Sequence, residues 1–316
     1  MIDSAESSLR SARVILEACP PALGDRKKAY AVLKQSFSIY NQFHAISVPD
    51  LQDEAEFGRT RERVPNIEFA AWLSDLTNKP LSLYKVSVNQ RPDQLDAWFE
   101  EARSLGCRDL FLVGGDSSST VYPEGTVDLA SAATLARDRG FECGGIIIPT
   151  RRSNFVERPA AVDEAARVRE KIERFGFRFF STQILVESAW MCCLMLDLVR
   201  SLEPERMPKL FLTFSPMVCD EDLRFARKTL GVYVPRDTIR RLQGARSMRE
   251  ACLSGLVQVW DRIYSFARDI GFPTERLGVN IEYLDSRNPR NVDAAFELAE
   301  EFGRIFSRTR AGKVKS

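Results

Sequence analysis

The chain has 316 residues, of which 44% are hydrophobic and 28% are charged. These proportions are typical of a globular protein, and no apolar run approaches the ~18–20 residues of a transmembrane helix. Because 45 Lys and Arg residues balance 44 Asp and Glu residues, the net charge of +1 gives no reason to expect a nucleic acid or a membrane surface as a partner.

Histidine occurs once, as His44. Catalytic triads and multi-histidine zinc sites need histidines at specified places, so most hydrolases of these classes are excluded and we expect no metal site. His44 itself begins a predicted strand, where a structural role is expected. The seven cysteines are odd in number and contain no CxxC pair, which is typical of reduced thiols. The first residues, MIDSAESSLR, do not resemble a secretory signal, and we expect a cytoplasmic protein.

Short apolar runs rich in β-branched residues alternate with longer segments of helical period. In the helix predicted at 93–105, for example, Leu95, Phe99 and Ala102 lie on one stripe, and Gly106 supplies a stop. The clearest predicted elements, in chain order, are strands 13–18, 43–48 and 83–88, helix 93–105, strands 109–113 and 144–148, helix 162–175, strands 177–185, 209–214 and 277–283, and helix 291–306.

Eight strands alternating with helices predict an α/β fold, namely a (β/α)8 TIM barrel. A doubly wound sheet would be expected to carry a glycine-rich phosphate-binding motif, and neither GxGxxG nor GxxxxGK[ST] occurs. The long gap between strands seven and eight must hold extra helices. We expect one domain over residues 1–316, with its core at about 12–307 and a frayed basic tail at 308–316.

Polar residues at the carboxyl ends of the predicted strands are the candidates for chemistry, because TIM-barrel active sites form there. A polar group buried without a partner costs roughly 2–7 kcal/mol, so these positions need a partner or a use. The candidates are Glu17, Asp116, Thr182, Gln183, Asn280 and Glu282, with Gly114 and Gly115 leaving room for a ligand.

Structural explanations compete with these functional ones. Glu17 could pair with a Lys or Arg from a neighbouring strand, and Asp116 could cap the turn after Gly115. Gln183 could be a core amide bonded to the backbone. Each position alone is moderate evidence, and their placement at the ends of several strands is stronger.

Four segments resemble the methylenetetrahydrofolate reductase superfamily, whose members are TIM barrels that are mostly flavin-linked. VILEACPP (14–21) resembles the family's first strand and places Glu17 on its catalytic glutamate. LVGGD (112–116) places Asp116 on its conserved-motif aspartate. VREKIERFGFRFFSTQ (168–183) and FSPMVCDEDLRFARKTLGVYVP (214–235) follow the family's later segments. The resemblance covers about residues 12–290.

The departures concern the flavin. Gly114 stands where the family has an arginine, and IIIPTRRSNF (146–155) replaces a stretch whose histidine helps to hold the flavin. HAISVPDLQDE (44–54) replaces a threonine-tyrosine-glycine pattern. These segments instead resemble a divergent branch that reduces the folate directly with NADH and without tightly bound flavin. NADH or NADPH is therefore the expected reductant, and FAD binding is in doubt.

The resemblance implies an oxidoreductase that interconverts 5,10-methylenetetrahydrofolate and 5-methyltetrahydrofolate, with Glu17 as general acid. Asp116 and Gln183 would bind the pterin edge, and Phe214 would stack on the aminobenzoyl ring. Thr182, Asn280 and Glu282 complete the expected substrate-binding set.

For the cofactor we expect Gly115, Arg151, Arg152 and Lys171. The two arginines could hold a pyrophosphate or the folate's glutamate tail, or could lie in a solvated loop. Lys171 is either a phosphate contact or an exposed helix residue.

Two other functions stay open. The same enzyme could work in the oxidative direction in one-carbon catabolism, or the barrel could bind folate without catalysis. A tetrahydrofolate is the expected small-molecule partner in each case, and the sequence leaves the formation of a homo-oligomer open.

Overall fold

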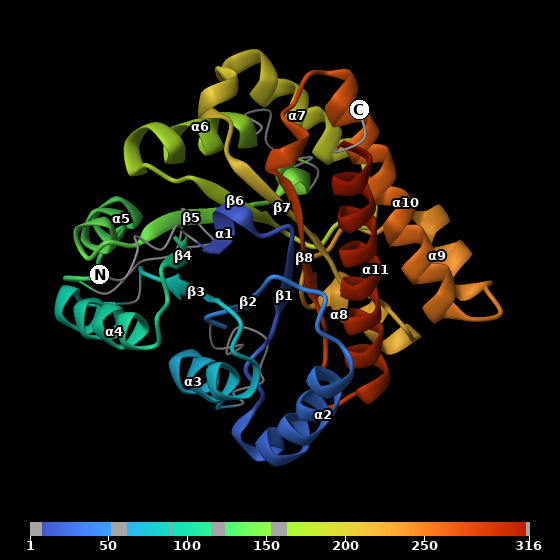
Figure 1. Ribbon diagram of the computed structural model, residues 1–316, viewed down its shortest axis with the longest axis horizontal. Helices are drawn as coiled ribbons and strands as arrows, with labels where there is room; N and C mark the ends of the chain where they lie inside the picture. Colours follow the sequence, from blue (N-terminus) through green and yellow to red (C-terminus); the bar gives the residue numbers. More distant parts are fainter. Residues whose placement is uncertain (1–7, 52–61, 89, 115–123, 153–162, 314–316) are drawn as a thin grey trace.

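The computed structural model describes residues 8–51, 62–88, 90–114, 124–152 and 163–313. Eight parallel strands form a closed barrel in which each strand pairs with the next in the chain, and the last, β8, pairs with the first, β1. Helices surround the outside of the barrel (Figure 1). The predicted (β/α)8 TIM barrel is therefore confirmed.

The strands are short, and each lies close to a predicted apolar run. They are β1 (Val14–Glu17), β2 (Ala45–Val48), β3 (Leu81–Val86), β4 (Asp109–Val113), β5 (Glu142–Ile147), β6 (Phe179–Thr182), β7 (Lys209–Phe214) and β8 (Leu277–Glu282). β4 and β7 have the predicted bounds. The segment predicted as strand 177–185 is strand only to Thr182, although Gln183 and Leu185 still donate backbone hydrogen bonds to β5 and β7.

The helices follow the strands in the order expected for βα units, with α8, α9 and α10 all between β7 and β8, as predicted. They are α1 (Ser8–Ser11), α2 (Arg26–Ile39), α3 (Asn66–Thr77), α4 (Pro92–Ser104), α5 (Leu129–Asp138), α6 (Glu164–Phe175), α7 (Ala189–Ser201), α8 (Asp220–Lys228), α9 (Arg236–Gln243), α10 (Met248–Asp269) and α11 (Pro289–Lys313), with 3-10 turns η1 (Leu23–Asp25), η3 (Pro149–Arg152), η4 (Pro204–Arg206) and η5 (Thr274–Arg276).

Helix α11 is longer than predicted, because its backbone stays helical to Lys313. The expectation that the basic tail frays from residue 308 was therefore wrong for residues 308–313. None of the helices that the structure describes combines the length and apolar character that crossing a bilayer requires.

The barrel interior and the barrel surface form two separate apolar clusters, because successive strand residues point to opposite faces. The interior cluster contains Ile15, Ala45, Phe111, Phe179 and Phe211 from five strands. Towards the carboxyl ends, the inward positions of β1, β6, β7 and β8 are polar, whereas Val113 and Ile146 extend the apolar cluster. The larger cluster lies between the outer faces of the strands and the helices. A packed middle layer therefore separates the two ends of the barrel.

Two glycines in β5 leave space for the aromatic rings of Phe179, in β6, and Phe177, just before β6. A Cβ atom at Gly144 would lie 2.2 Å from the ring of Phe179, and one at Gly145 would lie 2.9 Å from that of Phe177. Neither distance is tolerable between carbon atoms, so a larger residue here would force β5 and β6 apart. The glycines thus permit the interior packing of Phe179.

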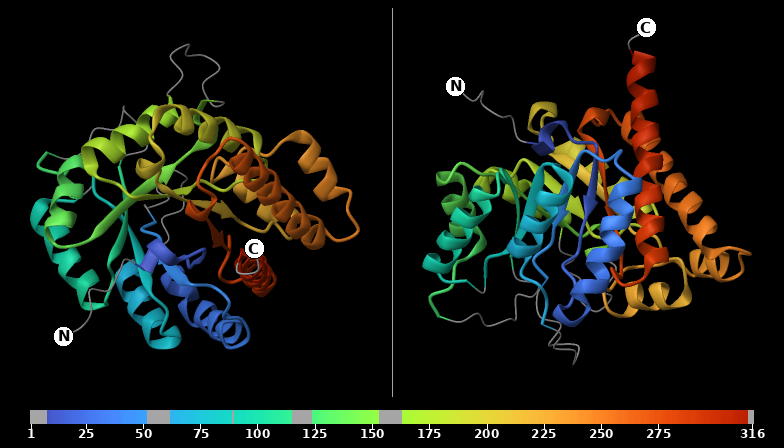
Figure 2. Two further views of the ribbon diagram at one scale, coloured as in Figure 1. Left: turned by 45° about the horizontal axis from the view of Figure 1, so that its top comes forward. Right: turned by 60° about the horizontal axis from the view of Figure 1, so that its bottom comes forward.

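Helix α1 closes the amino-terminal end of the barrel, which is the upper end in the right-hand view of Figure 2. Leu9 is completely buried and belongs to the interior cluster. Its backbone N–H donates to Oδ2 of the buried Asp109 over 3.1 Å, and Nζ of Lys209 donates to the carbonyl oxygen of Arg10 over 2.7 Å. Polar groups at this end are therefore bonded to the helix that covers them.

Candidate functional site

A buried carboxylate lies at the carboxyl end of β1. Glu17 is 8% exposed, and its Oε2 accepts a hydrogen bond from the Tyr84 hydroxyl over 2.8 Å and one from Nδ2 of Asn280 over 2.5 Å. Tyr84 comes from β3 and Asn280 from β8, so three strands converge on one carboxylate. Its partners are neutral donors, and the Lys or Arg partner weighed for Glu17 is not among its described contacts.

Asn280 is held by a network of hydroxyl groups inside the barrel. Its Oδ1 accepts from Ser47 over 3.3 Å, and its Nδ2 also lies 3.2 Å from Oγ of Ser181 and 3.3 Å from Oγ1 of Thr213. These last two hydroxyls are 2.9 Å apart. The amide is therefore fixed with its NH2 group towards Glu17.

A second carboxylate lies beside the first. Glu282 stands opposite Glu17 in the register of β8 and β1, and both side chains lie on the inner face of the barrel. Oε1 of Glu282 accepts a weak hydrogen bond from the Cys19 thiol over 3.9 Å. One ligand atom from each of Glu17, Cys19 and Glu282 lies within 4.8 Å of the others. Two carboxyl groups and a thiol thus share one small space.

The surroundings favour the protonated forms of these groups. Burial raises the pKa of Glu17, and the hydrogen bonds from Asn280 and Tyr84 oppose that rise. Burial, and then the charge of Glu17, raises the pKa of Glu282 well above its ordinary value. Burial also raises the pKa of the Cys19 thiol well above normal.

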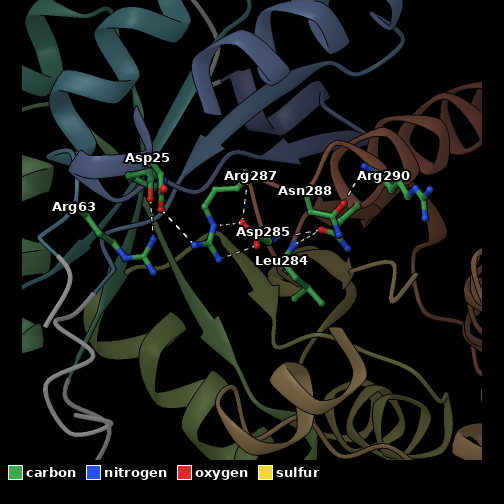
Figure 3. Close-up of polar contacts among 9 residues, drawn as sticks. Asp25, Arg63, Leu284, Asp285, Arg287, Asn288 and Arg290 are labelled. Carbon is green, nitrogen blue, oxygen red and sulfur yellow. Dashed lines mark hydrogen bonds and ion pairs between the residues drawn. The ribbon is translucent and has the colours of Figure 1, made fainter. Parts of the chain in front are cut away.

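A polar cluster on the same end of the barrel joins three loops (Figure 3). Arg287, after β8, donates from Nε and Nη2 to the two carboxylate oxygens of Asp285 over 2.9 Å each. Its Nη1 lies 3.4 Å from Oδ2 of Asp25 in η1, after β1. Arg63, before α3, donates to the Pro20 carbonyl oxygen over 3.0 Å, and its guanidinium points towards Asp25 in Figure 3.

These contacts hold the carboxylate of Asp285 ionised. Although burial acts the other way, the hydrogen bonds from Arg287 bring the pKa of Asp285 below its ordinary value. The same pairing raises the pKa of Arg287. The cluster therefore ties the loop after β8 to the loop after β1, the two strands that carry Glu282 and Glu17.

A crevice of about 190 Å³ opens between the loops that follow β1 and β2, and Pro20, Pro49, Leu51, Arg63 and Asn66 are among the residues that line it. Asp50, also on its wall, forms an ion pair of 3.1 Å with Nζ of the buried Lys85. The crevice thus begins one to three residues beyond the ends of β1 and β2, at the carboxyl end of the barrel.

Three further predicted site residues are placed by β6 and β7. Gln183 follows β6, and its Nε2 donates to the Leu230 carbonyl oxygen over 2.9 Å. Thr182 is 4% exposed, and its hydroxyl accepts from the backbone N–H of Thr213, so it serves the barrel wall and is not at the mouth. Phe214 is completely buried and stacks on Phe302 of α11, with 5.6 Å between ring centroids. This placement excludes the expected stacking of Phe214 on a substrate in the barrel.

Lys171 is not at the mouth either. Its Nζ donates to the Ile146 carbonyl oxygen over 2.9 Å and lies 5.9 Å from the centre of the Phe180 ring, which belongs to the outer core. Lys171 therefore joins α6 to the barrel, and the prediction of a phosphate contact is not supported. His44 accepts at Nδ1 from the backbone N–H of Val14 over 3.2 Å, at the end of the barrel away from Glu17.

The remaining predicted residues are described incompletely or not at all. Gly115 and Asp116 lie outside the described residues. Arg151 and Arg152 form the end of η3, directly after β5, and only their backbone is described. Tyr84, Ser181 and Cys19 are members of the site that sequence reasoning missed. Period-two counting along 81–86 and 179–182 would have placed the first two on an inner face once one inward residue was known.

Comparison with known proteins gives the same fold. No family model and no curated protein sequence matches the chain. An uncharacterized protein from Clostridium thermocellum, solved with two copies of 5-methyl-5,6,7,8-tetrahydrofolic acid, matches with a TM-score of 0.72 and 22% identity over 93% of this chain and 96% of that one.

Two more distant matches are enzymes. The carboxyl transferase domain of Rhizobium etli pyruvate carboxylase has a TM-score of 0.48 and 12% identity, over 94% of this chain and 50% of that one. The tryptophan synthase alpha-subunit of Pyrococcus furiosus has a TM-score of 0.46 and 12% identity, over 92% and 96%. Among these structures, the similarity to the Clostridium thermocellum protein is the one that supports the barrel assignment.

Proposed function

We propose that this chain binds a reduced folate at the carboxyl end of the barrel and interconverts 5,10-methylenetetrahydrofolate and 5-methyltetrahydrofolate, with NAD(P)H as the hydride donor. The observation that carries the proposal is the carboxyl pair Glu17 and Glu282, fixed by Asn280 where the strands end. The similar barrel from Clostridium thermocellum, which binds a methylated tetrahydrofolate, supports the choice of ligand.

The reaction needs what this pair can supply. A folate nitrogen must accept a proton before the methylene bridge opens, and the cation that then forms on the other nitrogen must be stabilised until hydride arrives. One protonated and one ionised carboxyl group, side by side, meet both needs. Burial raises the pKa of both groups and so favours the neutral form that a proton donor needs.

Recognition of the pterin ring would fall to Gln183 and Asp116. Gln183 uses its NH2 group on the Leu230 carbonyl, and its Oε1 is the acceptor that would face a pterin N–H group. Asp116, two residues beyond the last described residue of that loop, would accept from the pterin amino group. The 190 Å³ crevice beside Arg63 would take the folate's aminobenzoyl part.

We propose direct hydride transfer from the nicotinamide, without a resident flavin. The departures of Gly114 and of residues 146–155 from the flavin-binding pattern support this proposal. Lys171, bonded to the Ile146 carbonyl oxygen, is not part of the proposed nucleotide site. Arg151 and Arg152, at the end of η3, would hold the nucleotide's pyrophosphate. The physiological direction could be reductive or oxidative.

A folate-binding barrel without catalysis is the second candidate. The Clostridium thermocellum protein favours it, because that protein binds 5-methyl-5,6,7,8-tetrahydrofolic acid and a barrel that only binds folate would do the same. The carboxyl pair argues for catalysis, because a binding protein has no need of two carboxyl groups held within 4.8 Å of each other.

Two measurements separate these functions. Isothermal titration with 5-methyltetrahydrofolate should give one saturable binding event, and NADH or NADPH should be consumed when 5,10-methylenetetrahydrofolate is added. Binding without consumption of either nucleotide would favour the non-catalytic barrel, and absence of binding would overturn the proposal. A visible absorption spectrum of the purified protein tests the flavin, and a bound-flavin spectrum would contradict direct transfer.

A further inference from the structure

We infer that the carboxyl pair holds one proton, that this proton resides on Glu282, and that Glu282 gives it to the substrate while Glu17 stays ionised. The inference deepens the proposed function, on which it relies for the identity of the proton acceptor. It reverses the roles that the sequence resemblance implies, in which Glu17 is the acid.

The two carboxyl groups are too close to ionise independently. Glu17 and Glu282 are register partners on adjacent strands, and their oxygens lie within 4.8 Å. Among the described residues neither carboxylate forms an ion pair with a lysine or arginine, although the charge of Arg63 acts on the neighbouring Cys19 thiol. Like charges at this separation in a buried site disfavour the doubly ionised state.

The hydrogen-bond donors are distributed unequally between the two groups. Glu17 receives the Tyr84 hydroxyl and the Asn280 amide on the same oxygen, Oε2. Donors of this kind stabilise the ionised form of a carboxyl group. Burial and the nearby Glu17 charge raise the pKa of Tyr84 well above normal, so its hydroxyl keeps the proton that it donates.

Asn280 turns its NH2 group towards Glu17. Its Oδ1 accepts from Ser47, whereas its Nδ2 faces Glu17 and the hydroxyls of Ser181 and Thr213. The NH2 group can only donate, so in this orientation Asn280 stabilises the ionised form of Glu17.

Glu282 lacks comparable donors. Among the described residues its carboxyl oxygens receive the Cys19 thiol at 3.9 Å, which is a weak donor. The other titratable groups that interact with it are Glu17, Cys19, Tyr84 and Tyr283. Tyr84 gives its hydroxyl to Glu17, and Tyr283 gives its hydroxyl to the Cys19 carbonyl oxygen. Burial and the charge of Glu17 both raise the pKa of Glu282. Glu282 is also less buried than Glu17, towards the mouth where a substrate enters.

Glu282 begins the reaction by giving up its proton. The Glu282 carboxyl O–H bond breaks, and its proton bonds to the bridging folate nitrogen N10. The bond between N10 and the methylene carbon then breaks with its electron pair going to N10, which leaves an iminium cation at N5. The reduced nicotinamide gives hydride to the methylene carbon and becomes oxidised, so the carbon ends as a methyl group. Glu282 ends as a carboxylate and regains a proton from water.

Carbon-13 NMR of protein labelled at the glutamate side-chain carboxyl carbons tests the location of the proton without any substrate. In the wild-type protein, one carboxyl resonance should stay in the protonated position at neutral pH. Glu282→Gln should remove it. Glu17→Gln should keep it but move its titration to lower pH, because the neighbouring charge is gone. Cys19→Ala should retain it, and the exposed Glu205→Gln serves as the control for folding and assignment.

The opposite pattern would overturn the inference: a protonated resonance that survives Glu282→Gln and is lost in Glu17→Gln places the proton on Glu17. Absence of any protonated carboxyl group at neutral pH in the wild type would also overturn it. These outcomes do not depend on folate turnover, so they are distinct from a failure of the proposed function. If the reaction occurs, Glu282→Asp should recover part of the turnover that Glu282→Gln loses, with an altered pH profile of kcat.

Discussion

The two ends of the barrel both bury ionisable groups, and they treat them differently. At the amino-terminal end, Asp109 and Lys209 are bonded to the backbone of α1, which also covers them. At the carboxyl end, Glu17 and Glu282 lie beside each other, with a hydroxyl and an amide donor on Glu17 and only the weak Cys19 thiol on Glu282. The first arrangement gives each ionisable group a backbone partner, and the second places two carboxyl groups in competition for a proton.

The amino-terminal end therefore serves the stability of the fold, and the carboxyl end can serve the chemistry of the proposed reaction. A buried charge bonded to fixed backbone groups contributes to a unique closed structure and offers nothing to a ligand. A carboxyl pair that must share a proton is poised to transfer it. In TIM barrels the amino-terminal face commonly serves stability and the carboxyl face carries reactivity, which agrees with this contrast. The predictions below ask whether each end can be altered without the other.

The largest expected effect is the loss of turnover in Glu17→Gln. Without the ionised carboxylate the developing cation loses its stabilisation, and kcat should fall by about 10²–10⁴-fold. Affinity for 5-methyltetrahydrofolate should stay nearly unchanged, since the pterin contacts lie elsewhere. Steady-state consumption of NADH and titration calorimetry measure the two quantities. The control is Glu142→Gln, at the other end, and full activity of Glu17→Gln would remove this residue from the mechanism.

At the amino-terminal end, Leu9→Ala should reduce the free energy of unfolding by about 2–5 kcal/mol, because a completely buried side chain would leave a cavity. Folate affinity should not change. Urea unfolding followed by circular dichroism provides the measurement. Leu23→Ala, at the carboxyl end where that side chain is 39% exposed, should cost under about 0.5 kcal/mol. Equal losses in the two variants would contradict the role of Leu9 and α1 in closing the amino-terminal end of the barrel.

Lys209 predicts a dependence of stability on pH. Burial, aided by the charge of Arg13 and opposed by that of Asp109, lowers the pKa of Lys209 to about 7 from 10.5. Above pH 7 the unfolded chain holds a proton that the folded chain lacks, so this residue makes the free energy of unfolding rise with pH. Between pH 7 and pH 10.5 the contribution of Lys209 to the free energy of unfolding rises by at most about 1.4 kcal/mol per pH unit. Below pH 7 both states hold the proton, and the contribution no longer changes with pH.

Other groups titrate in this range, so the comparison uses a variant. Urea unfolding of the wild-type protein and of Lys209→Met at pH 7 and pH 8.5 should show the Lys209 contribution as a difference in slope. The wild type should gain stability relative to the variant as the pH rises. Parallel pH dependences in the two proteins would mean that Lys209 is protonated in the fold.

The smallest effect is expected at Asp25, in the polar cluster of Figure 3. The Asp25 and Arg287 side chains are 32% and 40% exposed and lie 3.4 Å apart, a geometry typical of a weak surface ion pair. Asp25→Asn should lower the free energy of unfolding by at most about 1 kcal/mol, less in high salt. A salt-independent loss of several kcal/mol would show that the loops after β1 and β8 depend on this pair.

The fold could be predicted because strand and helix periods are local properties of the sequence. Glu17, Asn280 and Glu282 could be placed together because each interrupts an apolar run near its end.

Tyr84 was missed because its contact with Glu17 depends on barrel closure, which no local pattern records. Phe214 was misplaced because every residue of β7 is buried, and such a strand does not reveal which of its faces is inward. Lys171 was predicted as a phosphate contact from its charge alone. Its long apolar stem instead lets its ammonium group reach a strand carbonyl oxygen.

The carboxyl pair has a consequence for how the protein is made. Glu17 belongs to the first strand and Asn280 and Glu282 to the last, and the contact between Glu17 and Asn280 spans 263 positions of the chain. Such distant pairings form late, after the entropy of a very long loop has been lost. A nascent chain that is still emerging from the ribosome therefore has β1 without its partner β8. Reactivity arises only with completion of the cylinder, and no partly folded fragment can deliver the proton prematurely.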